Sequence, residues 1–263
     1  MGTVKPAGQI LVEEMRHAID LLRGCVQPIF DVNERREAEL LGSGVLVEIC
    51  DSTFFCTAKH VVDHSTASDL YIYGPNKLEP LVGIFRSTEE HDVAVLRLSP
   101  EQTMLLQRFS PLRAEHIASE SEALASKYVE FIGYPATKNR KIYLKNMLEN
   151  FIHSNGCTVV EINASRIRVA FDQKRNIDAK TRQLVQAPDP HGMSGGAMFG
   201  VPMNAATLIG NPAPKLVGIT TAKPDSKEVF GTNIAIALAI IRDSWSTVLP
   251  ERLNPTHIKT HEL

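Results

Sequence analysis

The sequence has 263 residues, 43% of them hydrophobic, so it can bury a substantial core as one large or two small domains. Its 28 Lys and Arg residues nearly balance its 30 Asp and Glu residues. This balance gives no electrostatic reason to expect a nucleic-acid or membrane partner.

Four cysteines are present without a Cys-x-x-Cys pair, which argues against a zinc ribbon or a thioredoxin-like site. The apolar stretch from Ile10 to Leu22 is interrupted by charged residues, so neither a secretory signal nor a membrane span is predicted. A reducing compartment is the simpler inference from the cysteines. We therefore expect a cytoplasmic protein with no cofactor.

The predicted elements begin with a helix in residues 1–24, ended by Gly24. We expect it to pack on the rest of the protein rather than to bind a partner. Its apolar residues recur at helical spacing: Leu11, Val12, Met15, Ala18, Ile19 and Leu22.

Residues 25–98 contain short apolar runs separated by turn residues, which predict strands. Six strands could close one antiparallel barrel and leave no open edge. The predicted strands are Cys25–Phe30, Leu41–Cys50, Thr53–Ala58, Leu70–Gly74, Pro80–Arg86 and Val93–Leu98.

The polar stretch 99–126 is interpreted as a connection, after which residues 127–236 resume the strand pattern and predict a second barrel. Residues 237–263 hold a final apolar-striped helix and a tail; its stripe is Ala237, Ile240, Ile241, Trp245, Val248 and Leu249. The strands of the second barrel are Tyr128–Tyr134, Ile142–Phe151, Cys157–Ile162, Ile167–Phe171, Gly196–Gly200, Lys215–Ala222 and Phe230–Ile236.

Three segments carry residues of the kind that nucleophilic catalysis needs. His60 follows the strand ending at Ala58, Asp92 precedes the strand at Val93, and Ser194 lies in the glycine-rich run Gly192-Met193-Ser194-Gly195-Gly196. A serine hydroxyl is a poor nucleophile until an imidazole takes its proton, and the imidazole needs an acceptor that fixes its tautomer. Ser194, His60 and Asp92 would supply the nucleophile, the base and the acceptor.

Thr57-Ala58-Lys59-His60, Asp92-Val93-Ala94-Val95-Leu96 and the run around Ser194 resemble the three signatures of trypsin-like serine peptidases, which have the chymotrypsin fold. The resemblance implies an all-β fold of two six-stranded antiparallel barrels with added N-terminal and C-terminal helices. It also implies a serine endopeptidase with a catalytic triad, an acyl-enzyme on Ser194, and an oxyanion hole formed by the amides of Gly192 and Ser194.

The same resemblance locates the substrate-binding residues. Asp189 is one place closer to Ser194 than the aspartate of Arg- and Lys-selective members, a position that here holds Pro188. We therefore do not infer a preference for basic residues, and Thr220 and Ala222 favour a small or moderately polar pocket. The residues implied to contact a protein or peptide substrate are Pro188, Asp189, His191, Thr220, Thr221, Ala222 and Lys223.

Digestive members of the family carry an aspartate just before the nucleophile, and it pairs with a newly formed N-terminal amine. Here that residue is Met193, as in a bacterial-type member without the zymogen aspartate. A thioether cannot pair with an ammonium group, so we expect no activation by N-terminal processing.

Other interpretations remain. His60 and His64 have the spacing of metal ligands on a helix, but no third ligand is placed comparably, so no metal is expected. The chain could also be a peptide-binding module that has lost turnover, or an effector controlled by a regulatory protein partner.

Overall fold

The computed structural model describes residues 22–33, 37–65, 70–74, 77–106, 109–139, 152–177, 183–202, 213–222, 227–255 and 258. The helix predicted in 1–24 lies outside these residues except at its end, where Arg23–Cys25 form the 3-10 turn η1. The strand predicted over Ile142–Phe151 also lies outside them.

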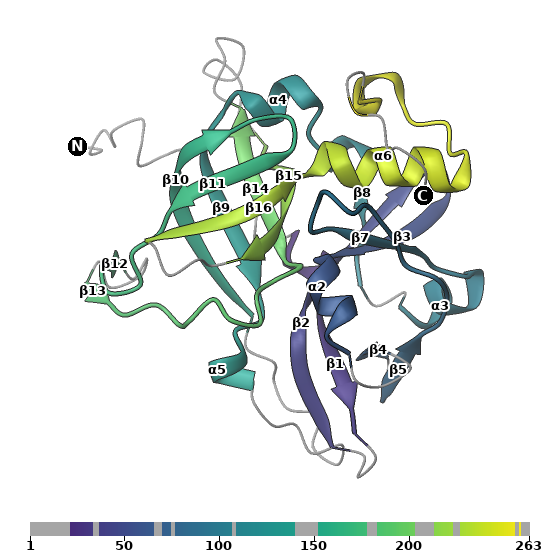
Figure 1. The fold of residues 1–263 in the computed structure, drawn as a ribbon, viewed down its shortest axis with the longest axis horizontal. Coiled ribbons are helices and arrows are strands. Elements are labelled where there is room, and N and C mark those ends of the chain that lie inside the picture. Colours follow the sequence, from purple (N-terminus) through teal and green to yellow (C-terminus); the bar gives the residue numbers. More distant parts are fainter. Residues whose placement is uncertain are drawn as a thin grey trace, which may run out of the picture.

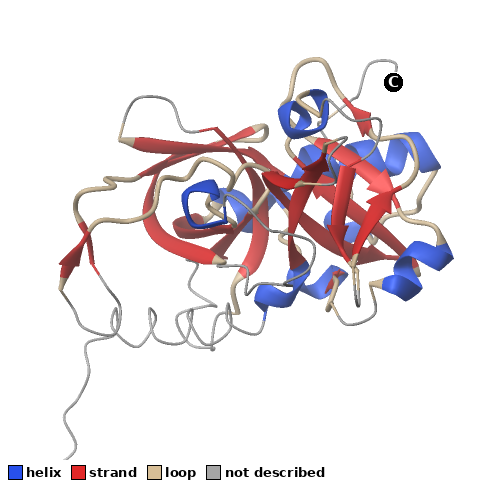
Figure 2. Cartoon of the chain, turned by 90° about the horizontal axis from the view of Figure 1, so that it is seen from below, coloured by secondary structure: helices blue, strands red, loops and turns tan. Residues whose placement is uncertain are grey.

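The described residues form two groups of strands, and strands make up most of both (Figure 1 and Figure 2). The first group is one eight-stranded sheet in the order β5-β4-β1-β2-β3-β7-β6, with β8 paired to β2. Its strands are β1 (Val26–Val32), β2 (Ala38–Ile49), β3 (Ser52–Thr57), β4 (Leu70–Tyr73), β5 (Leu78–Leu81), β6 (Arg86–Ser87), β7 (Ala94–Arg97) and β8 (Leu112–Arg113).

The first group curls into a half-barrel, in keeping with the predicted all-β fold of two barrels, but among the described residues its sheet keeps two edges, β5 and β6. A continuous strand over Pro80–Arg86 would have joined β4 to β7 and closed the ring. Instead the chain leaves the ladder after Leu81 and returns at Arg86, with Gly83 at a φ of 139°. Val82 and Ile84 are 61% and 70% exposed there, so this segment lacks the apolar burial that would hold it in a strand.

The second group is a closed barrel in the order β10-β11-β16-β15-β14-β9, as predicted. Side chains of Phe131, Cys157, Val169, Met198 and Val217 belong to its buried apolar cluster. Its strands are β9 (Ser126–Gly133), β10 (His153–Ile162), β11 (Arg166–Ala170), β14 (Ala197–Pro202), β15 (Lys215–Ala222) and β16 (Glu228–Asn233). A separate two-stranded sheet pairs β12 (Asn176–Ile177) with β13 (Leu184–Val185).

The stretch 99–126 contains structure that the sequence interpretation missed: α3 (Pro100–Leu105), β8, the 3-10 turn η2 (Ala114–His116) and α4 (Glu120–Leu124). Each helix begins with a capping box, Ser99 with Gln102 and Ser119 with Glu122. In each box the serine side chain accepts from a backbone N–H of the first turn, and the Gln or Glu side chain accepts from the serine backbone N–H.

The last long helix, α6, spans Ile234–Trp245, so the strand predicted over Phe230–Ile236 is too long by three residues. Asn233 caps the helix by accepting from the Ala235 N–H. The helix ends where Ser246 adopts a φ of 50°. Val248 is therefore not part of the helical stripe and is 84% exposed, and a short 3-10 turn, η3 (Glu251–Leu253), follows.

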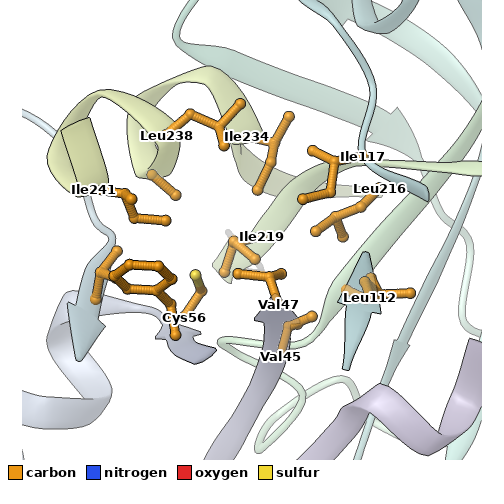
Figure 3. Packing of buried hydrophobic residues seen from close by; sticks show 14 of the residues in the cluster. Val45, Val47, Cys56, Leu112, Ile117, Leu216, Ile219, Ile234, Leu238 and Ile241 are labelled. Atoms are coloured by element: carbon orange, nitrogen blue, oxygen red, sulfur yellow. The ribbon is translucent and has the colours of Figure 1, made fainter. Parts of the chain in front are cut away.

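The largest apolar cluster joins the two groups of strands. Figure 3 shows Val45, Val47 and Cys56 from the first sheet opposite Ile219 from β15, with Ile234, Leu238 and Ile241 of α6 above them. Because this core is shared, the two groups form a single packed unit.

Among the described residues, no helix is long and apolar enough to cross a membrane. The four cysteines, Cys25, Cys50, Cys56 and Cys157, are all free, and Cys50 is the exposed one.

Candidate active site

His60 lies on the short helix α2 (Lys59–Asp63), which is near the middle of the molecule, where the two groups of strands face each other (Figure 1). Asp92 lies in the bend before β7. The His60 ring Nδ1 is 2.7 Å from Asp92 Oδ2, and the His60 backbone N–H donates to Asp92 Oδ1 at 2.9 Å. Because Asp92 accepts at Nδ1, the proton is held there and Nε2 is left as the basic nitrogen.

The electrostatics of Asp92 favour its ionised form. Burial acts to raise the pKa of Asp92, but the hydrogen bonds from the His60 ring and the His60 backbone outweigh it, so the pKa lies below its usual value. The carboxylate is therefore charged at neutral pH.

Ser194 lies in a tight turn between residue 190 and β14. Gly192 and Gly195 have φ angles of +88° and +85°, a conformation that favours glycine. The turn is tied to β15 by Gly195 N–H to the Thr220 carbonyl at 2.6 Å and Thr220 N–H to the Gly196 carbonyl at 2.8 Å. The serine is thus held rigidly over the end of the second barrel.

The same turn also packs on the first sheet, close to His60. Ser43 on β2 donates its N–H to the Ser194 carbonyl at 2.7 Å and its hydroxyl to the Gly192 carbonyl at 3.0 Å. A Cβ on Gly42 would lie 2.7 Å from the Val61 side chain and 3.0 Å from the Ser194 carbonyl oxygen. Glycine at position 42 therefore lets the Ser194 carbonyl lie close to Val61, which is on the helix that carries His60.

The Ser194 hydroxyl is turned toward β15. Its Oγ donates to the Thr221 carbonyl at 3.0 Å, rather than to His60. Attack on a substrate would therefore first require rotation of this side chain.

The amide groups around Ser194 are arranged so that two of them remain available. Ala136 N–H donates to the His191 carbonyl at 2.7 Å, and because the peptide bond is planar and trans, the Gly192 N–H points away from Ala136. Within the described ranges, neither the Gly192 amide nor the Ser194 amide has a hydrogen-bond acceptor. Gly192 is itself buried against the chain that carries Tyr134 and Ala136.

The residues expected to contact substrate lie on both sides of the serine turn. Pro188 and Asp189 are half-buried, and His191 is exposed. Asp189 accepts from the His191 backbone N–H at 3.0 Å, so it stabilises the turn. Thr220 and Thr221 are buried on β15, Ala222 ends that strand, and Lys223 lies outside the described residues.

His64 does not join a metal site with His60. Its ring Nδ1 contacts the His60 carbonyl oxygen at 2.5 Å, and the two rings meet edge to face. Across the described residues, no group of three or more His, Cys, Asp or Glu side chains could hold a metal ion.

Met193 is completely buried in the apolar cluster of the second barrel, together with Phe131 and Met198. An ammonium group placed beside it would be desolvated without a counter-charge, which costs several kcal/mol, on the order of 5.

Sequence reasoning missed the polar residues that join the two groups of strands at the site. Ser43 bonds to the serine turn, and Thr57 Oγ1 donates to the Ser43 carbonyl at 2.7 Å. Thr232 on β16 donates to the Asp92 carbonyl at 3.5 Å. No sequence motif marks Ser43, Thr57 or Thr232, because each bonds to a residue on another element. The one available signal was a single hydroxyl residue within an otherwise apolar strand.

Comparison with known proteins supports the fold. No family model and no curated protein sequence matches the chain. Among solved structures, the inactive form of the Rv3671c protease aligns with a TM-score of 0.50 at 15% identity, covering 92% of this chain and 98% of that one. A structure from work on the Sesbania mosaic virus VPg protein aligns with a TM-score of 0.45 at 10% identity, covering 80% and 92%.

With its closed barrel, curled companion sheet and few helices, the chain has a chymotrypsin-like β fold. This likeness concerns the fold alone, because one fold can carry many different chemistries.

Proposed function

We propose that the chain is a serine endopeptidase that cleaves peptide bonds through an acyl-enzyme on Ser194. His60 is the general base, Asp92 orients its ring, and the amides of Gly192 and Ser194 bind the oxyanion. The observation that carries this proposal is the 2.7 Å bond between His60 and Asp92 on one group of strands, facing a rigid serine turn on the other.

The chemistry follows from these contacts. With Nδ1 bonded to Asp92, Nε2 of His60 is the nitrogen that takes the serine proton and later protonates the leaving amine. Among the described residues, the amides of Gly192 and Ser194 have no acceptor to give up before they bind a developing negative charge. No cofactor is needed for this reaction.

A second candidate is a peptide-binding module that does not turn substrate over. The bond from Ser194 Oγ to the Thr221 carbonyl favours it, because the hydroxyl is engaged away from the base. A regulatory protein partner that releases this hydroxyl would turn the same molecule into a controlled enzyme.

Labelling with a fluorophosphonate separates the two candidates. We expect wild type to be labelled stoichiometrically, Ser194→Ala to be unlabelled, and Ser121→Ala, which removes an exposed serine on α4, to behave as wild type. Hydrolysis of a peptide library by wild type should accompany labelling. Unlabelled wild type, or equal labelling of Ser194→Ala, would contradict the assignment.

A further inference from the structure

Asp92 is held from both groups of strands. Its carboxylate accepts from the ring and the backbone of His60, while its backbone carbonyl accepts from the Thr232 hydroxyl of β16 at 3.5 Å. At 3.5 Å this last contact is longer than the roughly 2.5–3.0 Å that is usual for a hydroxyl donor, so it is a weak bond and small displacements decide whether it forms.

Thr232 has little alternative to this contact. It is 6% exposed, and among the described residues the Asp92 carbonyl is the acceptor that its hydroxyl reaches. A buried hydroxyl left without a partner costs roughly 1 to 3 kcal/mol, which favours keeping the two groups together.

The position of Thr232 in the ladder connects Asp92 with the serine. Thr232 pairs with Ile219 on β15. The next residue, Thr220, forms two backbone bonds with the serine turn, and Thr221 accepts from Ser194 Oγ. Ile219 itself is packed in the shared core (Figure 3). Adjacent residues of the β15–β16 ladder therefore contact both the serine turn and the Asp92 loop.

We propose that Thr232 is a positioning residue: through the Asp92 carbonyl it fixes the Asp92–His60 pair relative to Ser194. Thr232 touches neither substrate nor the reacting atoms. This inference rests on the proposed peptidase function, because its consequence for rate exists only if the three side chains react.

The test compares Thr232→Val, which keeps the shape and removes the donor, with Thr232→Ser, which keeps the donor. Thr53→Val is the matched control, since Thr53 is also 6% exposed and lies at the end of β3 away from His60. We expect Thr232→Val to lower kcat roughly ten- to a hundredfold with KM changed less than about twofold, as for small misplacements of catalytic groups. Thr232→Ser should recover most of kcat, and Thr53→Val should retain it.

A second readout does not depend on turnover. In the NMR spectrum, the resonance of the His60 Nδ1 proton bonded to Asp92 should move in Thr232→Val and return in Thr232→Ser. Wild-type kcat in Thr232→Val, or an unmoved resonance, would overturn the positioning role. If wild type itself neither cleaves nor labels, the peptidase proposal fails, and the resonance still decides whether Thr232 positions the His60–Asp92 pair.

Discussion

The side chain of Ser194 needs only a change of rotamer to leave the Thr221 carbonyl. Side-chain rotamers of partly exposed residues exchange within picoseconds to nanoseconds, so this bond is a weak barrier to catalysis. A neutral hydrogen bond contributes about 1 kcal/mol net, which His60 can replace by accepting the same proton. The resting geometry is therefore compatible with a working peptidase.

At the scale of the residue, Asp92→Asn should leave the fold intact and lower kcat by about ten-thousandfold, because the amide holds His60 in the wrong tautomer. The control is Asp63→Asn, which removes a carboxylate only three residues from His60 that pairs with Lys59 on the exposed side of α2. Peptide hydrolysis gives kcat, and circular dichroism checks the fold. A small effect, equal to that of Asp63→Asn, would exclude Asp92 from the reaction.

At the scale of the element, the hairpin between β2 and β3 turns on two residues, Cys50 and Asp51, with φ angles of 48° and 61°. Both angles lie in the left-handed region, which glycine adopts without strain and which Asn and Asp tolerate better than other residues. We expect Asp51→Gly to raise the free energy of unfolding by about 0.5 to 1 kcal/mol, measured by urea denaturation. Glu48→Gly, inside β2, should lower it, and two changes of the same sign would contradict the turn geometry.

The helix α4 is fastened to β15 by an ion pair between Glu122 and Lys215. Burial acts to raise the pKa of Glu122, but the bonds from Lys215 and the Ser119 backbone outweigh it, so the pKa is lowered. A lowered pKa means that the ion pair stabilises the fold above the usual carboxyl range, and that this contribution is lost as pH falls through the lowered value.

Glu122→Gln should therefore destabilise the protein by roughly 0.5 to 1 kcal/mol at pH 7, because solvent screens this partly exposed ion pair, and by much less at pH 3. Urea unfolding of both proteins at the two pH values measures the difference. A difference that is independent of pH would show that Glu122 acts through packing rather than charge.

The elements also show where sequence reasoning succeeds. Strands β10 and β11 of the second barrel follow the period-two pattern because one face of each is buried. Strands β14 and β15 are buried on both faces along most of their length and stand out in the sequence as apolar runs instead. The pattern does not predict the break at Val82 and Gly83, since that break depends on whether the edge strands β5 and β6 of the first sheet meet. The start of α6 was missed because the run from Ile234 to Ile241 is buried throughout and fits a strand equally well; Asn233 as a cap was the available signal.

The site shows the same division. Local motifs singled out His60, Asp92 and Ser194, and the structure brings the first two within hydrogen-bond distance. The positions of Ser43 and Thr232, and the direction of the Ser194 hydroxyl, depend on contacts between segments far apart in the chain. Contacts of this kind produce no regular spacing in the sequence from which they could be predicted.

For the whole molecule, the state of the four thiols reports on folding. Burial raises the pKa of the Cys56 and Cys157 thiols to about 12 and that of Cys25 further, whereas Cys50 is exposed. At pH 8 one thiol should react rapidly with a disulfide reagent, and three should react only as the protein unfolds. Cys50→Ser should lose the rapid phase alone; more than one rapid thiol in wild type would contradict the shared core.

That shared core has a consequence for the order in which the protein is made. The helix α6 completes the packing between the two groups of strands, and it follows His60, Asp92 and Ser194 in the chain. Synthesis proceeds from the N-terminus, so a growing chain holds all three side chains before it has the helix that completes the core between the two groups of strands. A chain ending at Asn233 should accordingly resist fluorophosphonate labelling. A peptidase with this order of elements would be unable to cut during its own synthesis until α6 had been added.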